Sequence, residues 1–406
     1  MRSLALTGLV CALAGLSPAA AKDAPATQPA DVATAVEGIN AFAADLYSRL
    51  AADEKGNIFF SPASIDTALA MTYAGARGQT ARQMAATLHY TLGQDRLHEA
   101  MGVLVRQLNA EGKDRGYKLA VANALWGAKG YTFKKDFLDL VAAHYEAELS
   151  EMNFSDYPEN VRKFINNWVE KRTNDKIKDL IPQGILDKDT RLVLTNAVYF
   201  KGDWALKFKP ESTKEAPFKL RGEKTVDVPM MHKSEDVPCF AGDGFALAQL
   251  PYKNDELSMV ILLPEKVDGL AKLEKDLTAR DLAGWIAKAR KTEVALTIPK
   301  FRMTCEFPLA KALMSMGMKD AFSDIADFSG MTEHESLFIS AVLHKAYVDV
   351  NEEGTEAAGA TAVVMKPTAI RMPTQFVADH PFLFLIRDNA TGAILFMGRM
   401  MNPKGE

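Results

Sequence analysis

The chain has 406 residues, of which 48% are hydrophobic and 25% charged, and its formal net charge is −4. This composition is typical of a globular protein with ample apolar material for a core. A mildly acidic chain without a basic stripe argues against nucleic acid as a partner. The length alone would allow about two or three domains. No linker rich in Pro, Gly or Ser and no internal repeat divides the sequence, so a single domain is expected.

The N-terminus predicts a secretory signal peptide over residues 1–21. Arg2 supplies the positive start, and residues 4–16 form an apolar stretch that is too short to cross a bilayer. Residues 19–21 are three alanines, the small side chains of a cleavage site. Cleavage is expected after Ala21 or slightly earlier, and the mature protein is then secreted, either extracellular or periplasmic.

The mature chain is expected to begin with a flexible arm over residues 22–37, where two prolines lie among small and polar residues. Residues 38–406 are expected to form the single folded domain. None of its apolar runs is long enough to span a membrane, so no membrane partner is expected.

The first half of the chain is predicted to be mainly helical, because apolar residues recur there at helical spacing. Ser61 followed by Pro62 is a good helix start, since the hydroxyl can cap and proline is tolerated in the first turn. The strand over 190–200 carries few charges, which predicts a central position with both faces covered. Helices are expected over 31–50, 62–74, 80–88, 95–110, 134–144 and 157–174, and strands over 57–60, 117–126 and 190–200.

The second half of the chain is predicted to be rich in strands. Residues 388–392, Asp-Asn-Ala-Thr-Gly, form a good hairpin turn between the last two of them. Helices followed by many strands favour an α+β fold. Strands are expected over 226–230, 245–251, 257–263, 293–307, 337–350, 382–387 and 393–400, and helices over 277–289 and 309–316.

The sequence contains none of the enzyme motifs that can be recognised from local spacing. It has no nucleophile elbow, no zinc-binding His-Glu-x-x-His, no phosphate-binding loop and no Cys-x-x-Cys. Its seven histidines are scattered. No metal, cofactor or catalytic residue is therefore expected, and Cys239 and Cys305 are interpreted as partly buried thiols.

Residues 351–373 form an unusually long connection between a strand and the closing hairpin. Residues 355–364 are mostly small or strand-forming, and Glu356 is the only charge among them. In a strand, Thr355, Ala357 and Gly359 would share one face with Thr361 and Val363. On composition alone, two interpretations of this segment are equally good. It is either an exposed loop that can become a strand or an Ala-rich surface loop.

Motifs along residues 38–403 resemble those of the serpins, in family order and at family spacing. Each match is modest evidence, but together they are specific. They are Asn-Ile-Phe-Phe-Ser-Pro-Ala-Ser at 57–64, Leu-Thr-Asn-Ala-Val-Tyr-Phe-Lys-Gly-Asp-Trp at 194–204, Leu-Pro-Tyr at 250–252, Leu-Pro at 263–264, Ile-Pro-Lys-Phe at 298–301, Ala-Asp-Phe-Ser-Gly at 326–330, His-Lys-Ala at 344–346, Glu-Glu-Gly-Thr-Glu-Ala-Ala-Gly-Ala at 352–360, Asp-His-Pro-Phe-Leu-Phe at 379–384 and Phe-Met-Gly-Arg at 396–399.

The resemblance implies a metastable fold of three β-sheets and about nine helices, with an exposed reactive-centre loop over residues 352–373. It implies a suicide-substrate inhibitor of serine or cysteine proteases and not an enzyme: the protease cuts the loop, and the cut loop inserts into the main sheet. The alternative within the family is a non-inhibitory carrier or chaperone. Such relatives often have bulky or charged hinge residues, whereas the hinge here is made mostly of small ones.

The resemblance also assigns site residues. Family spacing counted from Glu352 places the scissile bond at Thr368–Ala369, with Lys366, Ile370 and Arg371 as alternatives in a shifted register. Small residues at the bond favour an elastase-like or subtilisin-like protease, whereas cleavage after Arg371 would indicate a trypsin-like one. The hinge consists of Glu352, Gly354, Thr355, Glu356, Ala357, Ala358, Gly359 and Ala360. The shutter, a polar cluster beneath the central strands, consists of Ser61, Ser64, Asn196 and His344, and Trp204 marks the breach, where the loop enters.

Some relatives bind sulfated polysaccharide in the region that corresponds to residues 95–115. Here Arg96, Arg106, Lys113 and Arg115 alternate with acidic residues, which is typical of a solvated face. No heparin site is therefore expected, and the protein is expected to be a monomer.

Overall fold

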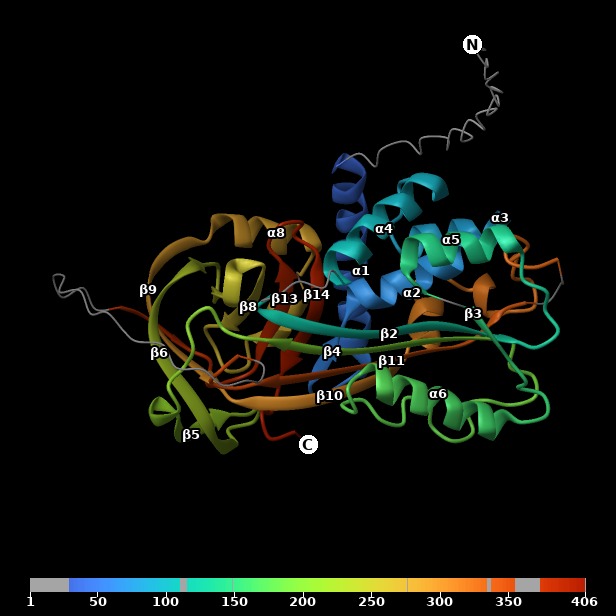
Figure 1. The fold of residues 1–406 in the computed structure, drawn as a ribbon. Helices are drawn as coiled ribbons and strands as arrows, with labels where there is room; N and C mark the ends of the chain where they lie inside the picture. The colour runs from blue at the N-terminus through green and yellow to red at the C-terminus, as the bar shows by residue number, and fades with distance from the viewer. Residues whose placement is uncertain are drawn as a thin grey trace, which may run out of the picture.

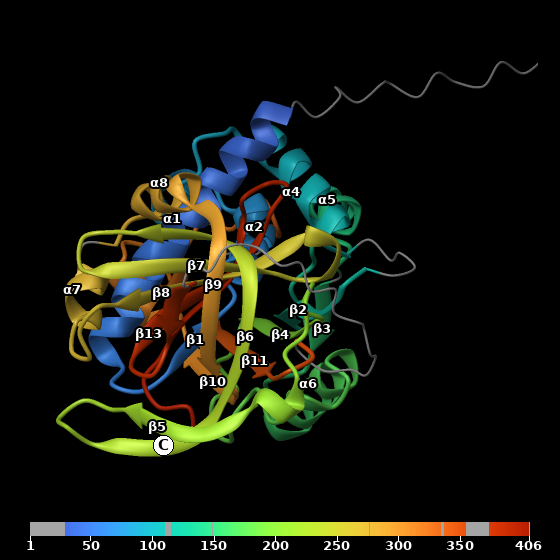
Figure 2. The same ribbon diagram turned by 90° about the vertical axis from the view of Figure 1, so that its left-hand side faces the viewer.

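The structure is a computed structural model that describes residues 29–109, 115–147, 149–275, 277–333, 337–354 and 373–405. Its centre is a five-stranded sheet with helices on both faces (Figure 1). Helices α2 to α5 lie on one side of this sheet, and α6 lies on the other. A second, nine-stranded sheet stands at one end, where β6 and β9 curve around the molecule (Figure 2). The α+β class is confirmed.

Among the described residues there are nine α-helices, as expected. They are α1 (Pro29–Asp53), α2 (Pro62–Gly75), α3 (Gly78–Thr87), α4 (Gln94–Asn109), α5 (Lys135–Tyr145), α6 (Pro158–Arg172), α7 (Leu270–Lys275), α8 (Ala279–Lys288) and α9 (Ala310–Ser315).

The strands of the described residues form two hydrogen-bonded sheets, with the orders β10-β11-β4-β2-β3 and β1-β14-β13-β8-β7-β6-β9-β12, and β5 pairs with β6. They are β1 (Ile58–Phe60), β2 (Tyr117–Ala128), β3 (Leu149–Met152), β4 (Leu192–Gly202), β5 (Lys214–Lys219), β6 (Thr225–Ala241), β7 (Phe245–Pro251), β8 (Leu257–Pro264), β9 (Arg290–Pro299), β10 (Phe301–Pro308), β11 (Ile339–Val350), β12 (Thr374–Val377), β13 (Phe382–Asp388) and β14 (Ile394–Met400).

The number of sheets differs from the three that were expected, because β6 joins two of them. This 17-residue strand pairs with β5 and β9 along one part and with β7 near its end. The hydrogen-bond ladder therefore continues from one expected sheet into the next. The sequence pattern predicted only residues 226–230 of this strand, since polar residues obscure the alternation beyond them.

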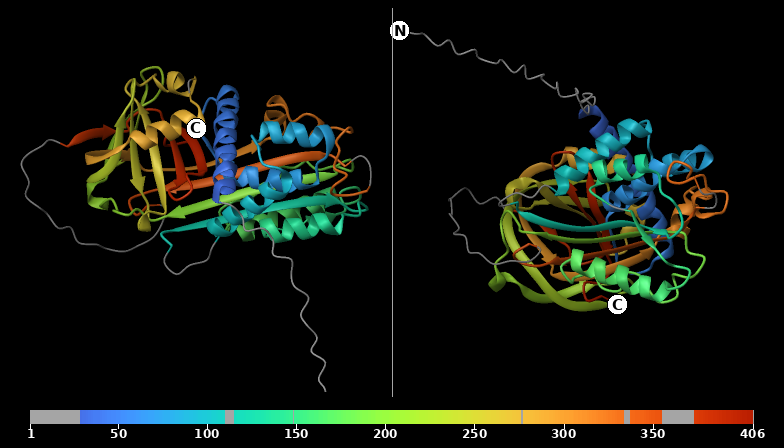
Figure 3. Two further views of the ribbon diagram at one scale, coloured as in Figure 1. Left: turned by 90° about the horizontal axis from the view of Figure 1, so that it is seen from above. Right: turned by 45° about the vertical axis from the view of Figure 1, so that its right-hand side comes forward.

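Helix α2 and strand β4 are the most deeply buried elements near the site. Ser61 caps α2 by accepting a hydrogen bond from the Ser64 backbone, and every α2 residue except Thr67 is buried. Strand β4 is buried at every position except Lys201. Helix α2 packs on one face of the sheet and α6 on the other (Figures 1 and 3), so the central position predicted for this strand is confirmed.

The prediction of a flexible arm over residues 22–37 is wrong from residue 29 onward, because α1 begins at Pro29. Ala35 and Val36 are buried, and the buried Asp31 carboxylate is paired with Arg96 of α4. This packing comes from residues far along the chain, so local composition did not reveal it. Residues 1–28, including the predicted signal peptide, lie outside the described residues. Among the described helices, none is long and apolar enough to cross a membrane.

Candidate site of loop insertion

The five-stranded sheet contains a parallel pair, β4 and β11, and the line between these strands is called the seam here. Their pairing runs from Leu192 opposite Ile339 to Tyr199 opposite Tyr347 and then stops. Both strands continue beyond this point, β4 to Gly202 and β11 to Val350. The seam is therefore open at the end where the chain leaves β11.

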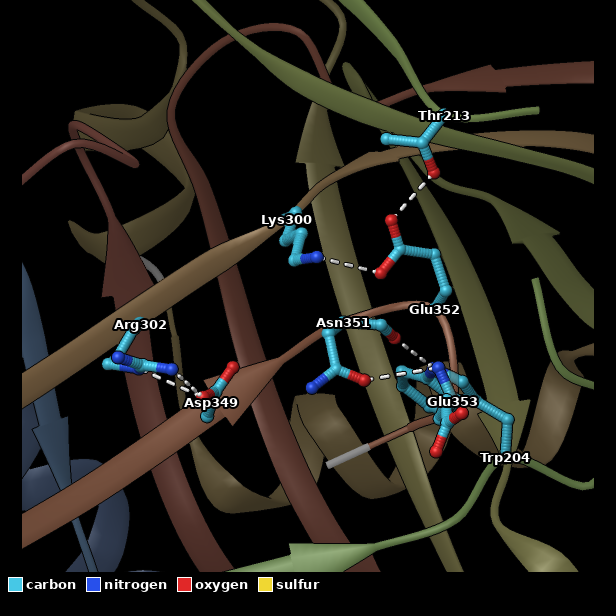
Figure 4. A network of polar contacts seen from close by, with 8 residues as sticks. All are labelled: Trp204, Thr213, Lys300, Arg302, Asp349, Asn351, Glu352 and Glu353. Carbon is cyan, nitrogen blue, oxygen red and sulfur yellow. Dashed lines mark hydrogen bonds and ion pairs between the residues drawn. The ribbon is translucent and has the colours of Figure 1, made fainter. Parts of the chain in front are cut away.

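The two halves of the sheet on either side of the seam remain paired to the same end. Strand β2 pairs with β4 as far as Gly202, and β10 pairs with β11 as far as Val350. Arg302 of β10 adds a two-pronged ion pair to Asp349 of β11, with N–O distances of 2.8 and 2.6 Å (Figure 4). The opening is thus confined to the seam, between two intact halves.

The predicted shutter residues meet at the middle of the seam. Asn196 and His344 stand opposite each other in the β4–β11 register, and a His344 Nδ1–Asn196 Oδ1 hydrogen bond of 2.5 Å joins them. Ser61, at the start of α2, donates its backbone N–H to His344 Nε2 at 3.1 Å. The Ser64 hydroxyl accepts from Asn196 Nδ2 at 2.6 Å. The network ties helix α2 to both strands of the seam.

These contacts define the protonation state of His344. Nε2 accepts the Ser61 N–H, so Nδ1 carries the proton that is donated to Asn196. The side chain is fully buried, and burial lowers the pKa of the imidazole to about 3. His344 is therefore neutral at physiological pH, and protonating it would remove the acceptor for Ser61.

Asn123 of β2 also belongs to the network, although the sequence did not identify it. It stands opposite Asn196 in the β2–β4 register and accepts hydrogen bonds from Asn196 Nδ2 and, at 3.1 Å, from Ser64 Oγ. Asn123, Asn196 and His344 thus form a row across three neighbouring strands. The only available signal was an amide within the largely apolar run of residues 119–126.

The start of the predicted hinge turns back toward β4. Asn351 and Gly354 exchange backbone hydrogen bonds of 2.9 and 3.2 Å, and Gly354 forms an antiparallel bridge with Asp203, just beyond β4. The φ of Gly354 is +128°, and a Cβ atom there would lie 2.1 Å from the Gly202 carbonyl oxygen. Only glycine fits this position, for reasons of both backbone angle and space.

A segment after β4, residues 203–213, holds this turn and is called the clasp here (Figure 4). The Trp204 backbone N–H donates to the Glu353 carbonyl at 3.0 Å, and the Phe208 N–H donates to the Glu352 carbonyl at 2.8 Å. The Trp204 indole N–H donates to the Asn351 carbonyl at 2.9 Å. Trp204, predicted to mark the breach, is fully buried and stacks on Tyr252 with ring centroids 4.6 Å apart.

The side chain of Glu352 anchors the same turn. Its carboxylate accepts hydrogen bonds of 2.9 Å from Lys300 Nζ and 2.9 Å from Thr213 Oγ1 (Figure 4). Partial burial opposes ionisation of Glu352, but the hydrogen bonds from Lys300 and Thr213 outweigh it, and the pKa of the carboxyl lies below its usual value. The ionised carboxylate therefore fixes the point where β11 becomes the loop.

The other predicted loop residues lie outside the described residues. These are the hinge positions Thr355, Glu356, Ala357, Ala358, Gly359 and Ala360, and the bond positions Lys366, Thr368, Ala369, Ile370 and Arg371. Cys239 and Cys305 are half-buried and not paired in a disulfide. Within the described ranges, no group of three or more His, Cys, Asp or Glu side chains is arranged to hold a metal ion.

Comparison with known proteins agrees with this architecture. The family model for serpin (serine protease inhibitor) matches residues 37–403. Leukocyte elastase inhibitor of Xenopus laevis is 42% identical over 370 residues, covering 89% of this chain and 97% of that protein. Leukocyte elastase inhibitor of Bos taurus is 43% identical over 371 residues, with the same coverage of both chains.

A solved structure gives the same result for the fold. The thermophilic serpin tengpin, in its native state, superposes with a TM-score of 0.82 and 29% identity, covering 90% of this chain and 94% of that one. The seam, the shutter network and the clasp therefore lie in a fold shared with solved serpins, and the chain belongs to the serpin family of serine protease inhibitors.

Proposed function

We propose that the protein is a secreted suicide-substrate inhibitor of serine proteases that traps its target by inserting the cleaved loop between β4 and β11. The observation that carries the proposal is the bridge between Gly354 and Asp203 at the open end of the seam. The chain after β11 has already turned antiparallel to β4 there, which is the direction an inserted strand must take. The new strand would replace one parallel pair by two antiparallel pairs.

The length of the loop fits the length of the seam. If the antiparallel register of the Gly354–Asp203 bridge continues, Thr355 comes opposite Gly202 and Met365 opposite Leu192, the first residue of β4. Residues 355–365 would then pair with the whole of β4. A protease cut before Met365 would leave part of the seam unfilled, whereas a cut after it allows complete insertion.

Thr368–Ala369 remains the proposed scissile bond, because it lies just beyond the segment that full insertion requires. Its small side chains suit an elastase-like or subtilisin-like protease, and both relatives described above are named as leukocyte elastase inhibitors. Lys366, Ile370 and Arg371 also lie beyond Met365, so cleavage at any of them is compatible with full insertion.

The proposed trap uses the chemistry of the protease itself. The protease serine attacks the Thr368 carbonyl, the bond to Ala369 breaks, and Thr368 becomes an ester on the enzyme. Insertion of the loop then carries the attached protease along the sheet. Hydrolysis of the ester needs accurate geometry in the protease's oxyanion hole, so distortion of that site stops the reaction.

The test is to incubate the protein with pancreatic elastase and to look for a complex that survives SDS, locating the cut by mass spectrometry. A matched pair of variants separates insertion from binding. Ala357→Arg places a charge on the face shared with Thr355 and Gly359, whereas Glu356→Arg places it on the opposite face. Ala357→Arg is expected to be cleaved without forming a complex, and Glu356→Arg is expected to form one. Cleavage of the wild-type chain without any stable complex would instead support the carrier or chaperone alternative.

The signal peptide predicted over residues 1–21 is the basis for proposing secretion, extracellular or periplasmic, and we propose a monomeric mature protein. Expression of the full chain in its source cells should yield a mature protein of monomer mass that begins at Lys22 in the medium or periplasm. An intact N-terminus in the cytosolic fraction would contradict this part of the proposal.

A further inference from the structure

A buried lysine lies directly beneath the clasp. Lys233 belongs to β6, and its side chain is only 7% exposed. Lys233 Nζ lies 2.7 Å from Glu235 Oε2, on the same face of the same strand. Lysine is rarely this buried unless it is paired, since taking its charge out of water is costly.

Among the described residues, the other contacts of the Lys233 ammonium are made to the clasp. Nζ donates a hydrogen bond of 2.5 Å to the Leu206 carbonyl. It lies 4.4 Å from the centroid of the Phe208 ring and 5.8 Å from that of Trp204, both within the range of cation–π attraction. The Lys233 ammonium therefore links β6 to the Leu206 carbonyl and to the two aromatic rings of the segment 204–208.

The same segment supplies the donors that hold the hinge. The backbone N–H groups of Trp204 and Phe208 bind the carbonyls of Glu353 and Glu352, as described above. These two donors flank Leu206, the residue whose carbonyl Lys233 binds. Between residues 204 and 208 the clasp has no helical or strand structure of its own, so its position depends on such tertiary contacts.

We propose that Lys233 is a positioning residue for loop insertion: its ammonium holds residues 204–208 where they retain the hinge, and thereby limits the rate at which the loop enters the seam. The proposal rests on the function proposed above and adds a residue that controls its timing. Glu235 supports Lys233 by supplying the compensating charge.

The test compares Lys233→Met, which keeps the length of the side chain without its charge, with Lys233→Arg, which keeps the charge and stacks well on aromatic rings. Lys219→Met is the control, because Lys219, the last residue of β5, forms an exposed ion pair with Asp379. A further variant, Lys233→Met with Glu235→Gln, leaves no unpaired carboxylate and covers the case in which the single variant folds poorly.

The first measurement is hydrogen exchange of the Trp204 and Phe208 amides, followed by mass spectrometry in the full-length, uncleaved protein. Both Met-containing variants are expected to exchange about tenfold faster, the effect of losing one hydrogen bond to a buried charge, whereas the Arg variant should match the wild type. Unchanged exchange in the Met-containing variants would overturn the proposal. So would equally fast exchange in the Arg variant, since that would mean that packing and not charge matters.

The second measurement is the rate at which the uncleaved protein converts to a loop-inserted, urea-resistant form below its unfolding midpoint. The Met-containing variants should convert about tenfold faster than the wild type, and the Lys219→Met control should not. Faster amide exchange without faster conversion would overturn the claim that Lys233 limits insertion. Absence of any SDS-stable complex in the wild type would count against the proposed function, while the exchange experiment would still decide whether Lys233 positions the clasp.

Discussion

His344 and Asn196 are hydrogen-bonded directly across the line along which the sheet must part. The same two residues are opposite each other in the β4–β11 register, so their side-chain bond reinforces the main-chain pairing at the middle of the seam. Ser61 and Ser64 connect both residues to the start of α2. Opening the seam therefore requires the network to exchange partners, which links the shutter to the timing of insertion.

Replacing His344 with alanine is expected to make the seam open more readily. The change leaves the Ser61 N–H and the Asn196 carbonyl oxygen without their partner, at a cost of roughly 1–3 kcal/mol for each buried group. Polymerisation on heating below the unfolding midpoint, followed on native gels, should be about tenfold faster than in the wild type. His89→Ala is the control, because His89 is exposed and pairs with Asp45 away from the seam. Equal rates for His344→Ala and the wild type would refute the role of the network.

Acid is expected to weaken the same contact. The pKa of His344 is about 3 in the fold, below the usual value of 6.5. Its contribution to stability is therefore complete above pH 6.5 and is lost as the pH falls toward 3. Urea unfolding of the wild type and of His344→Ala should show a difference in free energy that shrinks over this range. A difference that stays constant from pH 7 to about pH 4 would contradict this assignment.

Asp66 is expected to destabilise the native state at neutral pH. It is fully buried in α2, and both its carboxylate oxygens lack a hydrogen-bond partner among the described residues. Burial raises the pKa of Asp66 from 3.8 to about 8. With respect to this group, the native state is therefore most stable below pH 3.8, and it loses stability as the pH rises toward 8. Each pKa unit corresponds to about 1.4 kcal/mol.

Asp66→Asn should therefore raise the free energy of unfolding by a few kcal/mol at pH 8 and change it little at pH 4, measured with urea at both pH values. A stabilisation that is the same at both values would show that the carboxyl does not titrate in this way. Asp45→Asn is a suitable control, since Asp45 is exposed on α1.

Reversing the charge of Glu352 should release the hinge. Glu352→Lys would place two cations together in place of the Glu352–Lys300 pair and would remove the acceptor for Thr213. Heat-induced polymerisation should accelerate, and the exchanged pair, Glu352→Lys with Lys300→Glu, should return it toward the wild-type rate. An exchanged pair as fast as the single variant would indicate that the ion pair does not hold the turn.

The sequence predicted those parts of the molecule that depend on local pattern. The long helices have apolar stripes, β4 has few charges, and Ser61–Pro62 does begin α2. The shutter and the hinge came from motif resemblance, and the structure brings all four predicted shutter residues together. The short elements α7, β3, β5 and β12 were missed, because segments of 4–6 residues carry too little periodicity.

Contacts between residues far apart in the sequence could not be predicted from local sequence patterns. Asn123 bonds residues 59 and 73 positions away, and nothing in its own strand indicates those partners. Lys233 lies in a stretch of polar residues that suggests a solvated surface, yet the clasp covers it. In both cases a polar residue is buried by an element that only the tertiary fold brings near.

The thermal unfolding midpoint of the chain after a single cut in the loop tests the central claim most directly. If the native sheet is metastable and accepts the cut segment between β4 and β11, the cleaved protein must unfold at a clearly higher temperature than the intact protein. A cleaved protein that unfolds at the same temperature or lower, with residues 355–365 still open to proteases, would contradict the account.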